Sequence, residues 1–252
     1  MHASAVTSGV LAGLGKEFLN GHALRRMWPG VLTEGMRNTV LYTLVAFTGG
    51  IVLGLFVALA RMSRRRAFRF PAAVFVDVIR GLPALLTIVF IGYGVPIAYK
   101  GVTGHFWRWP LGDFGAVYLP GCSALAIVGA AYMAESIRGG IEAVPRGQME
   151  AARSLGMSHG RAMLKVVLPQ AFRIALPSLT NEMAALFKDT SLIAILGVKV
   201  GGREILQYAR TWQNTLANTT PLVAGGLAYL VITIPLLRLV ATLERRSKGG
   251  AR

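Results

Sequence analysis

The sequence predicts an all-α integral membrane protein with about five transmembrane helices. Four runs without a charged residue, at 38–60, 81–99, 114–134 and 211–237, have 23, 19, 21 and 27 residues. Each run is long enough to cross a bilayer, since about 20 apolar residues span its hydrocarbon core. The chain is 54% hydrophobic and only 15% charged, so a soluble domain with four such buried helices would lack polar surface.

The basic residues lie between the apolar runs and predict an orientation. The net charge of +16 also occurs in nucleic-acid-binding proteins, but clustering between spans fits the positive-inside rule better. Five Lys and Arg lie at 61–69, six at 135–173 and four at 244–252, against two and three in the loops between. We therefore expect an outside N-terminus, a cytoplasmic C-terminus and no nucleic-acid partner.

The predicted organisation is a single transmembrane domain with short ends. Spans are expected over 37–60, 70–99, 116–136, 172–197 and 219–243, within a domain at 35–245. A basic cytoplasmic tail covers 246–252. The N-terminal arm, 1–34, mixes apolar residues with Arg25 and Arg26, which fits either an interfacial helix on the outer side or a poorly ordered arm. It lacks the pattern of a cleaved signal peptide.

Glycine and proline mark two of the spans. Gly50 and Gly54 in the first span have the spacing that lets helices pack closely in lipid, and packing within the subunit is the simpler interpretation. Pro83 and Pro96 in the second span each remove a backbone donor, which predicts a kink or a break.

Sequence motifs for catalysis or metal binding are missing. Cys122 is the only cysteine, which excludes a disulfide within the chain and a cysteine-based metal cluster. The sequence has no phosphate-binding Gly-x-x-x-x-Gly-Lys-Ser/Thr motif and no His-Glu-x-x-His or Cys-x-x-Cys motif. We expect no catalytic residue, no metal site and no cofactor on this chain, which would not be an enzyme.

The loop at 135–173 is longer than a connector requires. Its pattern predicts a helix over 147–157 that ends at Gly156. Ser158 would cap a second helix over 159–168, which would end at Pro169. Two short helices joined at a glycine form a rigid knob, which is suited to docking a partner.

The loop motif resembles the EAA loop of ABC importer permeases. The matching residues are Glu150, Ala151, Ala152, Gly156, Val166, Leu168 and Pro169, with Val166 where the family usually has Ile. Further elements at 80–83, 134–141, 168–171, 175–177, 181–182 and 188–192 are similar to polar amino-acid permeases of the histidine, glutamine and arginine type. The similarity covers about 35–245, with departures at Leu82 and Thr87 that leave the substrate open.

This resemblance implies the inner-membrane permease subunit of a bacterial importer that works by alternating access. A dimer of ABC ATPase subunits, which carry the ATP and Mg²⁺, would dock on the loop. The other implied partners are a second permease subunit (identical or different), an extracytoplasmic solute-binding protein, a small polar solute and the lipid bilayer. The implied docking residues are Glu150, Ala151, Ala152, Gly156, Leu168 and Pro169. For Glu150 alone, a solvated helix residue is the alternative.

Charged residues inside the predicted spans form a second candidate site. A charge at the bilayer centre costs about 2.5–3.5 kcal/mol on insertion scales, and Glu182 and Asp189, seven residues apart, share a helix face. The candidates for the pathway or the substrate are Arg80, Glu135, Glu182, Lys188, Asp189 and Thr190. The alternatives are an ion pair, of Lys188 with Asp189 or between helices, that locks the bundle, and snorkelling of Arg80 to the interface.

Two other functions explain part of the sequence. A secondary transporter driven by an ion gradient would use in-membrane acids, but the chain shows no inverted repeat. A membrane assembly factor without a transport role would explain the spans but not the spacing of the EAA motif.

Overall fold

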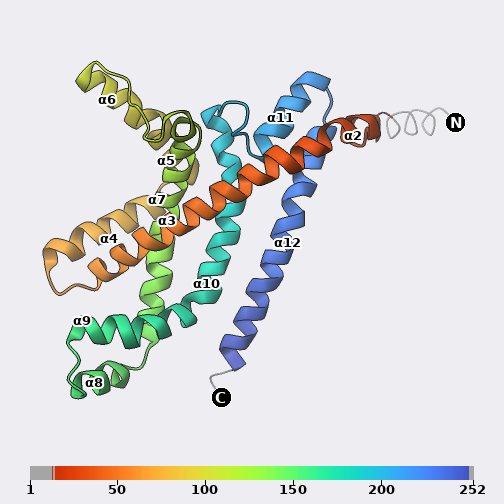
Figure 1. Ribbon diagram of the computed structural model, residues 1–252. Coiled ribbons are helices and arrows are strands. Elements are labelled where there is room, and N and C mark those ends of the chain that lie inside the picture. The colour runs from red at the N-terminus through yellow and green to blue at the C-terminus, as the bar shows by residue number, and fades with distance from the viewer. Residues whose placement is uncertain (1–12, 14, 250–252) are drawn as a thin grey trace.

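The computed structural model describes residues 13 and 15–249, and this part of the chain is mainly helical (Figure 1). Five of its helical segments are long and apolar enough to cross a membrane, which confirms the predicted fold class. In chain order the elements are α2 (Gly21–Gly30), η1 (Val31–Met36), α3 (Arg37–Arg61), α4 (Arg66–Gly81), α5 (Ala84–Val89), η2 (Phe90–Gly94), α6 (Val95–Thr103), α7 (Gly112–Ala143), α8 (Arg146–Ser154), α9 (His159–Ala162), η3 (Met163–Val167), α10 (Leu168–Asp189), η4 (Thr190–Leu196), α11 (Ile205–Leu216) and α12 (Thr220–Gly249).

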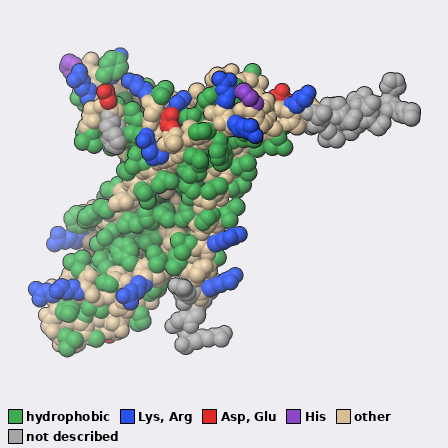
Figure 2. All heavy atoms as spheres, turned by 45° about the vertical axis from the view of Figure 1, so that its right-hand side comes forward, with side chains coloured by type: hydrophobic (Ala, Val, Ile, Leu, Met, Phe, Trp, Pro, Cys, Tyr) green, Lys and Arg blue, Asp and Glu red, His purple; other side chains and the backbone are tan. Residues whose placement is uncertain are grey.

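The long helices α3, α7, α10 and α12 form a bundle with two distinct ends (Figure 1). The short helices α8 and α9 lie at one end, near the C-terminus, and this end is called the α8 end below. Helices α6 and α11 lie at the opposite end, called the α11 end. Hydrophobic side chains cover the surface between the two ends, and Lys and Arg side chains gather toward the ends (Figure 2). Such a broad apolar surface is stable against lipid and not against water.

The first membrane helix is longer than a bilayer is thick. It runs from Gly15 to Arg61, 47 residues, which corresponds to about 70 Å of helix against a hydrocarbon core of about 30 Å. In Figure 1 it crosses the bundle obliquely. Its first part packs on α11 and α12 through the buried side chains of Met27 and Val31, which contact Ile205. The interfacial position of this segment stays a prediction, and residues 1–12 and 14 of the arm lie outside the described residues.

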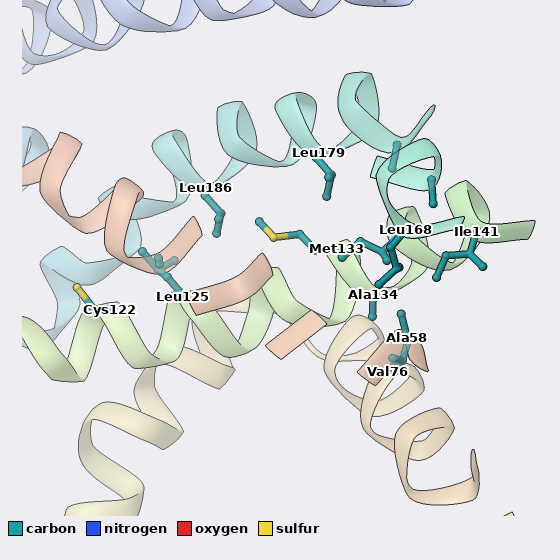
Figure 3. Close-up of a cluster of buried hydrophobic side chains, with 14 of the residues drawn as sticks. Ala58, Val76, Cys122, Leu125, Met133, Ala134, Ile141, Leu168, Leu179 and Leu186 are labelled. Atoms are coloured by element: carbon teal, nitrogen blue, oxygen red, sulfur yellow. The ribbon is translucent and has the colours of Figure 1, made fainter. Parts of the chain in front are cut away.

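Glycine permits the close crossing of α3 and α7. A Cβ atom on Gly50 would lie 3.1 Å from the sulfur of Met133, and one on Gly54 would lie 3.0 Å from the carbonyl oxygen of Ala130. The glycine face therefore packs within the subunit, as expected. Next to this crossing a continuous apolar core joins α7 to α10, with Leu125 and Met133 facing Leu186 and Leu179 (Figure 3).

The second predicted span is divided at Pro83. Leu82 has an extended backbone and Pro83 precedes α5, so α4 is a separate helix and the membrane-spanning segment begins at Ala84. The predicted start at residue 70 is therefore wrong, whereas the predicted break at Pro83 is confirmed. Pro96 lies in the first turn of α6, directly after the π-helical stretch η2, and the helix continues through it. In a membrane helix a local π-helical adjustment of this kind accommodates a proline, which removes one backbone donor.

Candidate functional site: an exposed helical loop and a charged cavity

The loop between α7 and α10 forms the predicted helical knob. Helix α8 ends in a Schellman motif, in which the amide of Gly156 donates to the carbonyl of Arg153 and the amide of Met157 donates to that of Ala152. Gly156 has φ +85°, a conformation that glycine adopts without steric cost. The predicted helix end at Gly156 is confirmed. Ser158 occupies the N-cap position of α9, as expected, but its side chain makes no capping hydrogen bond.

The knob presents both charged and apolar groups on its surface. Glu150 and Ala151 are exposed, and Leu155 at the tip is 82% exposed. Ala152 is instead buried, and α8 packs on α9 through it and Ala162. Leu164, 66% exposed, is a second exposed apolar side chain of the same loop, and a docked partner would remove both side chains from water.

The second helix of the knob does not end at Pro169, so this prediction is wrong. Helix runs without a break from His159 through η3 and α10 to Leu196. Pro169 lies directly after the π-helical stretch Met163–Val167, and its missing N–H removes one backbone donor from the continuous helix. The side-chain amide of Gln170 donates to the carbonyl of Val166 at 2.9 Å, which helps to satisfy the backbone there.

The knob is joined rigidly to two membrane helices. Gly140 of α7 lies against α10: a Cβ atom there would lie 2.6 Å from the carbonyl oxygen of Ala171 and 3.0 Å from the Cβ of Ala175. Leu168, Ala171 and Ile141 are buried in the core at this crossing (Figure 3). A displacement of the knob must therefore move α7 and α10 together, because packed helices slide poorly past such a contact.

A cavity of about 320 Å³ lies between α5, α7 and α10 and contains several of the predicted pathway residues. Glu182 and Asp189 line it from one face of α10, as their spacing predicts. Arg80 lies beside it, 5.3 Å from the ring centroid of Tyr132, and its charge and that of Asp189 act on Glu182. The lining residues are Ala84, Val128, Gly129, Tyr132, Asn181, Glu182, Ala185, Leu186 and Asp189.

The other three pathway candidates lie outside this cavity. Lys188 is exposed, and among the described residues it forms no ion pair with Asp189 within 4.0 Å. Thr190 is buried and donates to the carbonyl of Phe187 at 2.7 Å. Glu135 pairs with Arg61 of α3 and, at 2.8 Å, with Arg138. Thr190 and Glu135 thus make contacts within the protein, Lys188 is exposed, and a role of the three residues in the pathway stays a prediction.

Two cavity residues were not singled out from the sequence. Tyr132 offers its ring to Arg80 and lies on α7, and a single tyrosine in an apolar span gives no signal of this position. Asn181 precedes Glu182 and also lines the cavity. Two adjacent polar residues inside a span were the sequence signal that could have identified Asn181.

Nothing in the sequence indicated the buried carboxylate of Glu204 at the α11 end. Glu204 is 0% exposed and caps α11, where its side chain accepts hydrogen bonds from the amides of Leu206 and Gln207. The hydroxyl of Tyr229 in α12 donates to it at 2.7 Å. Burial raises the pKa of Glu204 from 4.5 to about 7, although the hydrogen bonds from Tyr229 and the two amides act in the opposite direction.

The pKa of Glu204 predicts a pH dependence of stability. Because the folded-state pKa lies above the unfolded one, the stabilising contribution is complete below about pH 4.5 and is lost as the pH rises through about 7. We expect the unfolding temperature in detergent to fall over this interval. In Glu204→Gln that part of the fall should disappear, whereas Glu244→Gln, at an exposed position, should keep the wild-type profile. Parallel profiles for Glu204→Gln and wild type would contradict the assignment.

Comparisons with known proteins converge on one family. Residues 50–249 match the family described as binding-protein-dependent transport system inner membrane component. The probable glutamine ABC transporter permease protein GlnM of Bacillus subtilis is 36% identical over 213 residues, covering 84% of this chain and 91% of that protein. The glutamine transport system permease protein GlnP of Escherichia coli K12 is 31% identical over 228 residues, covering 88% and 96%.

Solved structures give the same result. A crystal structure of an amino acid ABC transporter with histidines has a TM-score of 0.73 and 31% identity, covering 90% of this chain and 99% of that one. The MetNI methionine ABC transporter, in an inward-facing conformation, has a TM-score of 0.64 at 19% identity, covering 90% and 98%. The second similarity shows the fold alone.

Proposed function

Because the chain belongs to the family of binding-protein-dependent transport system inner membrane components and is a permease subunit of an ABC importer, we propose that it imports polar amino acids. The observation that carries the proposal is the rigid knob at residues 146–162, whose exposed surface fits a docking site and whose base is packed into α7 and α10. The relatives named above are glutamine permeases and an amino acid transporter, which supports the substrate class.

The proposed assembly places two ATPase subunits at the α8 end. Each would bind one knob through Glu150, Ala151, Ala152 and the turn at Gly156, while Leu168 and Pro169 begin the helix that transmits the movement. ATP and Mg²⁺ would be held by the ATPases. The distribution of basic residues supports a cytoplasmic α8 end and C-terminus, with the N-terminus outside.

The remaining partners follow from this orientation. A second permease subunit, a copy or a close relative, would complete the pathway. A solute-binding protein would dock at the α11 end, where the 197–204 segment is held to the first helix by the ion pair between Arg203 and Glu34 at 2.9 Å. A rigid outer surface of this kind suits the docking of a preformed partner.

The cavity between α5, α7 and α10 is the proposed position of the solute inside the membrane. Glu182 and Asp189 place two carboxylates at its wall, and Asn181 adds a side-chain amide to the lining. These groups complement the ammonium group of an amino acid, and Arg80 beside Tyr132 could pair with its carboxylate. A polar lining also keeps the bound solute weakly held, which passage requires.

Substitutions in the cavity test the proposed solute position. We expect Glu182→Gln and Asp189→Asn to raise the KM for uptake of the transported amino acid at least about tenfold, since a hydrogen bond to a charged group contributes about 1.5–3 kcal/mol. Glu244→Gln is the matched control, because it removes an exposed carboxylate that does not line the cavity. The measurement is ATP-dependent uptake of a panel of radiolabelled amino acids into proteoliposomes. An unchanged KM in both cavity variants would reject this position.

A further inference from the structure

A second, larger cavity lies at the α8 end, in the corner formed by the end of α3, the start of α4 and α7. Its volume is about 730 Å³. Four arginines line it: Arg61, Arg66, Arg69 and Arg138. The proposed solute pathway and the docking knob do not use this corner. A concentration of guanidinium groups in one hollow is the arrangement that binds phosphate, because each group can donate two parallel hydrogen bonds to phosphate oxygens.

Two of these arginines are already engaged within the protein. Arg61 pairs with Glu135 and, at 3.7 Å, with Asp77. Arg138 pairs with Glu135 at 2.8 Å and, at 2.6 Å, with Glu142, which also lines the hollow. Arg66 and Arg69 are exposed on the first turn of α4. Among the described residues, neither lies within 4.0 Å of a carboxylate. The hollow therefore has a fixed wall and two cations that a ligand could neutralise.

Apolar side chains next to the hollow suit the binding of a lipid. Phe70 and Met62 also line it, and Phe70 continues into an exposed apolar face of α4 that includes Val74 and Val78. Arg66, Phe70, Val74 and Val78 follow one another at four-residue intervals, so the basic start of α4 leads along neighbouring faces into its exposed apolar part. A helix that joins arginines to exposed apolar groups in this way is suited to the boundary between headgroups and acyl chains. Basic hollows between membrane helices bind the headgroups of anionic lipids.

We propose that this hollow binds the phosphate of an anionic phospholipid in the leaflet at the α8 end. Arg66 and Arg69 hold the phosphate, Arg61 and Arg138 with their carboxylate partners form the fixed wall, and the acyl chains lie along Phe70 and the apolar face of α4. The proposal does not depend on which solute the protein carries.

Lipid binding to neutralised variants tests the proposal. The double variant Arg66→Gln/Arg69→Gln removes the two unengaged cations. The matched control is Arg64→Gln/Arg65→Gln, which has the same net charge and alters adjacent exposed residues that do not line the hollow. The intact chain in detergent is titrated with phosphatidylglycerol or phosphatidylcholine, and the bound lipid is counted by native mass spectrometry.

We expect the Kd for phosphatidylglycerol to rise at least about tenfold in the first variant, since the loss of one hydrogen bond to a charged group already corresponds to about a tenfold factor. The control should change less than about threefold if the site is local and not a diffuse surface effect. Phosphatidylcholine should bind all three proteins alike. The variant Arg66→Lys/Arg69→Lys should bind phosphatidylglycerol more tightly than the glutamine variant and more weakly than wild type, because it keeps the charge and loses the paired hydrogen bonds. This partial recovery shows that the loss in the glutamine variant does not come from misfolding.

Three results would overturn the proposal. Equal losses in the two glutamine variants would mean that the basic segment attracts lipid only diffusely. Displacement of phosphatidylglycerol by inorganic phosphate at a similar concentration would identify a site for a soluble phosphate compound. Weaker ATPase association in the Arg66→Gln/Arg69→Gln variant, with unchanged lipid binding, would assign the arginines to the protein partner.

Discussion

Replacing Leu155 at the tip of the knob by aspartate is expected to abolish stable association with the ATPase and, with it, ATP-driven uptake. Leu155 is 82% exposed and stands on the turn that Gly156 forms at the end of α8. If the ATPase covers it, the substitution removes an apolar anchor and places a charge in a desolvated contact. Loss of a central anchor costs about 2 kcal/mol or more, so the Kd should rise at least about 30-fold.

The matched control is Leu111→Asp. Leu111 is also a highly exposed leucine, 71%, but it lies at the α11 end, before α7. Association is measured by titrating the purified ATPase onto the permease in nanodiscs. Equal affinity of the Leu155→Asp variant and wild type would show that the knob tip is not part of the contact. Glu150→Lys, on the exposed face of α8, should weaken association in the same direction.

Substituting Gly140 by valine should be the most damaging change at the base of the knob. The added Cβ would lie 2.6 Å from the backbone oxygen of Ala171, and backbone cannot move aside as a flexible side chain can. Overpacking of this kind costs about 1–3 kcal/mol or more, which corresponds to a fall of several degrees, about 2–4 °C per kcal/mol, in the unfolding temperature. Uptake should fall further, because α7 and α10 would no longer move as one with the knob.

Gly139→Val is the control for this change. Gly139 precedes Gly140 on the same helix, and a Cβ atom on Gly139 would meet no neighbouring element within 4 Å. The Gly139→Val variant therefore also replaces a glycine of α7 but introduces no clash. Thermal unfolding in detergent and ATP-driven uptake are compared for both variants. A decrease in stability or uptake in Gly139→Val that equals or exceeds that in Gly140→Val would show that the close crossing of α7 and α10 is not responsible.

Local backbone chemistry explains which parts of the fold could be predicted. The break before α5 follows from the restriction that Pro83 places on Leu82, and the end of α8 follows from the need for glycine at Gly156. The prediction at Pro169 was wrong because a proline that follows a helix and a proline at the start of the next helical stretch give the same signal in the sequence. Only the continuous course of the chain through Met163–Val167 distinguishes the two.

The residues of the candidate site are brought together more by contacts between helices than by their spacing in the sequence. Glu182 and Asp189 were predicted to share a face because seven residues are about two helical turns, and they line one cavity. The partner of Glu135 in α3, Arg61, lies 74 positions away in the chain and could not be inferred from spacing. The same holds for Glu204 and Tyr229, which α11 and α12 bring together.

Uptake driven by ATP alone is the most direct test of the permease function. The chain is reconstituted in liposomes with its ATPase, ATP is enclosed on the ATPase side, and the solute-binding protein is supplied on the other with radiolabelled polar amino acids. We expect uptake that requires ATP and persists when an uncoupler abolishes all ion gradients. Uptake that proceeds without ATP and stops with the uncoupler would contradict the importer mechanism and identify a secondary transporter.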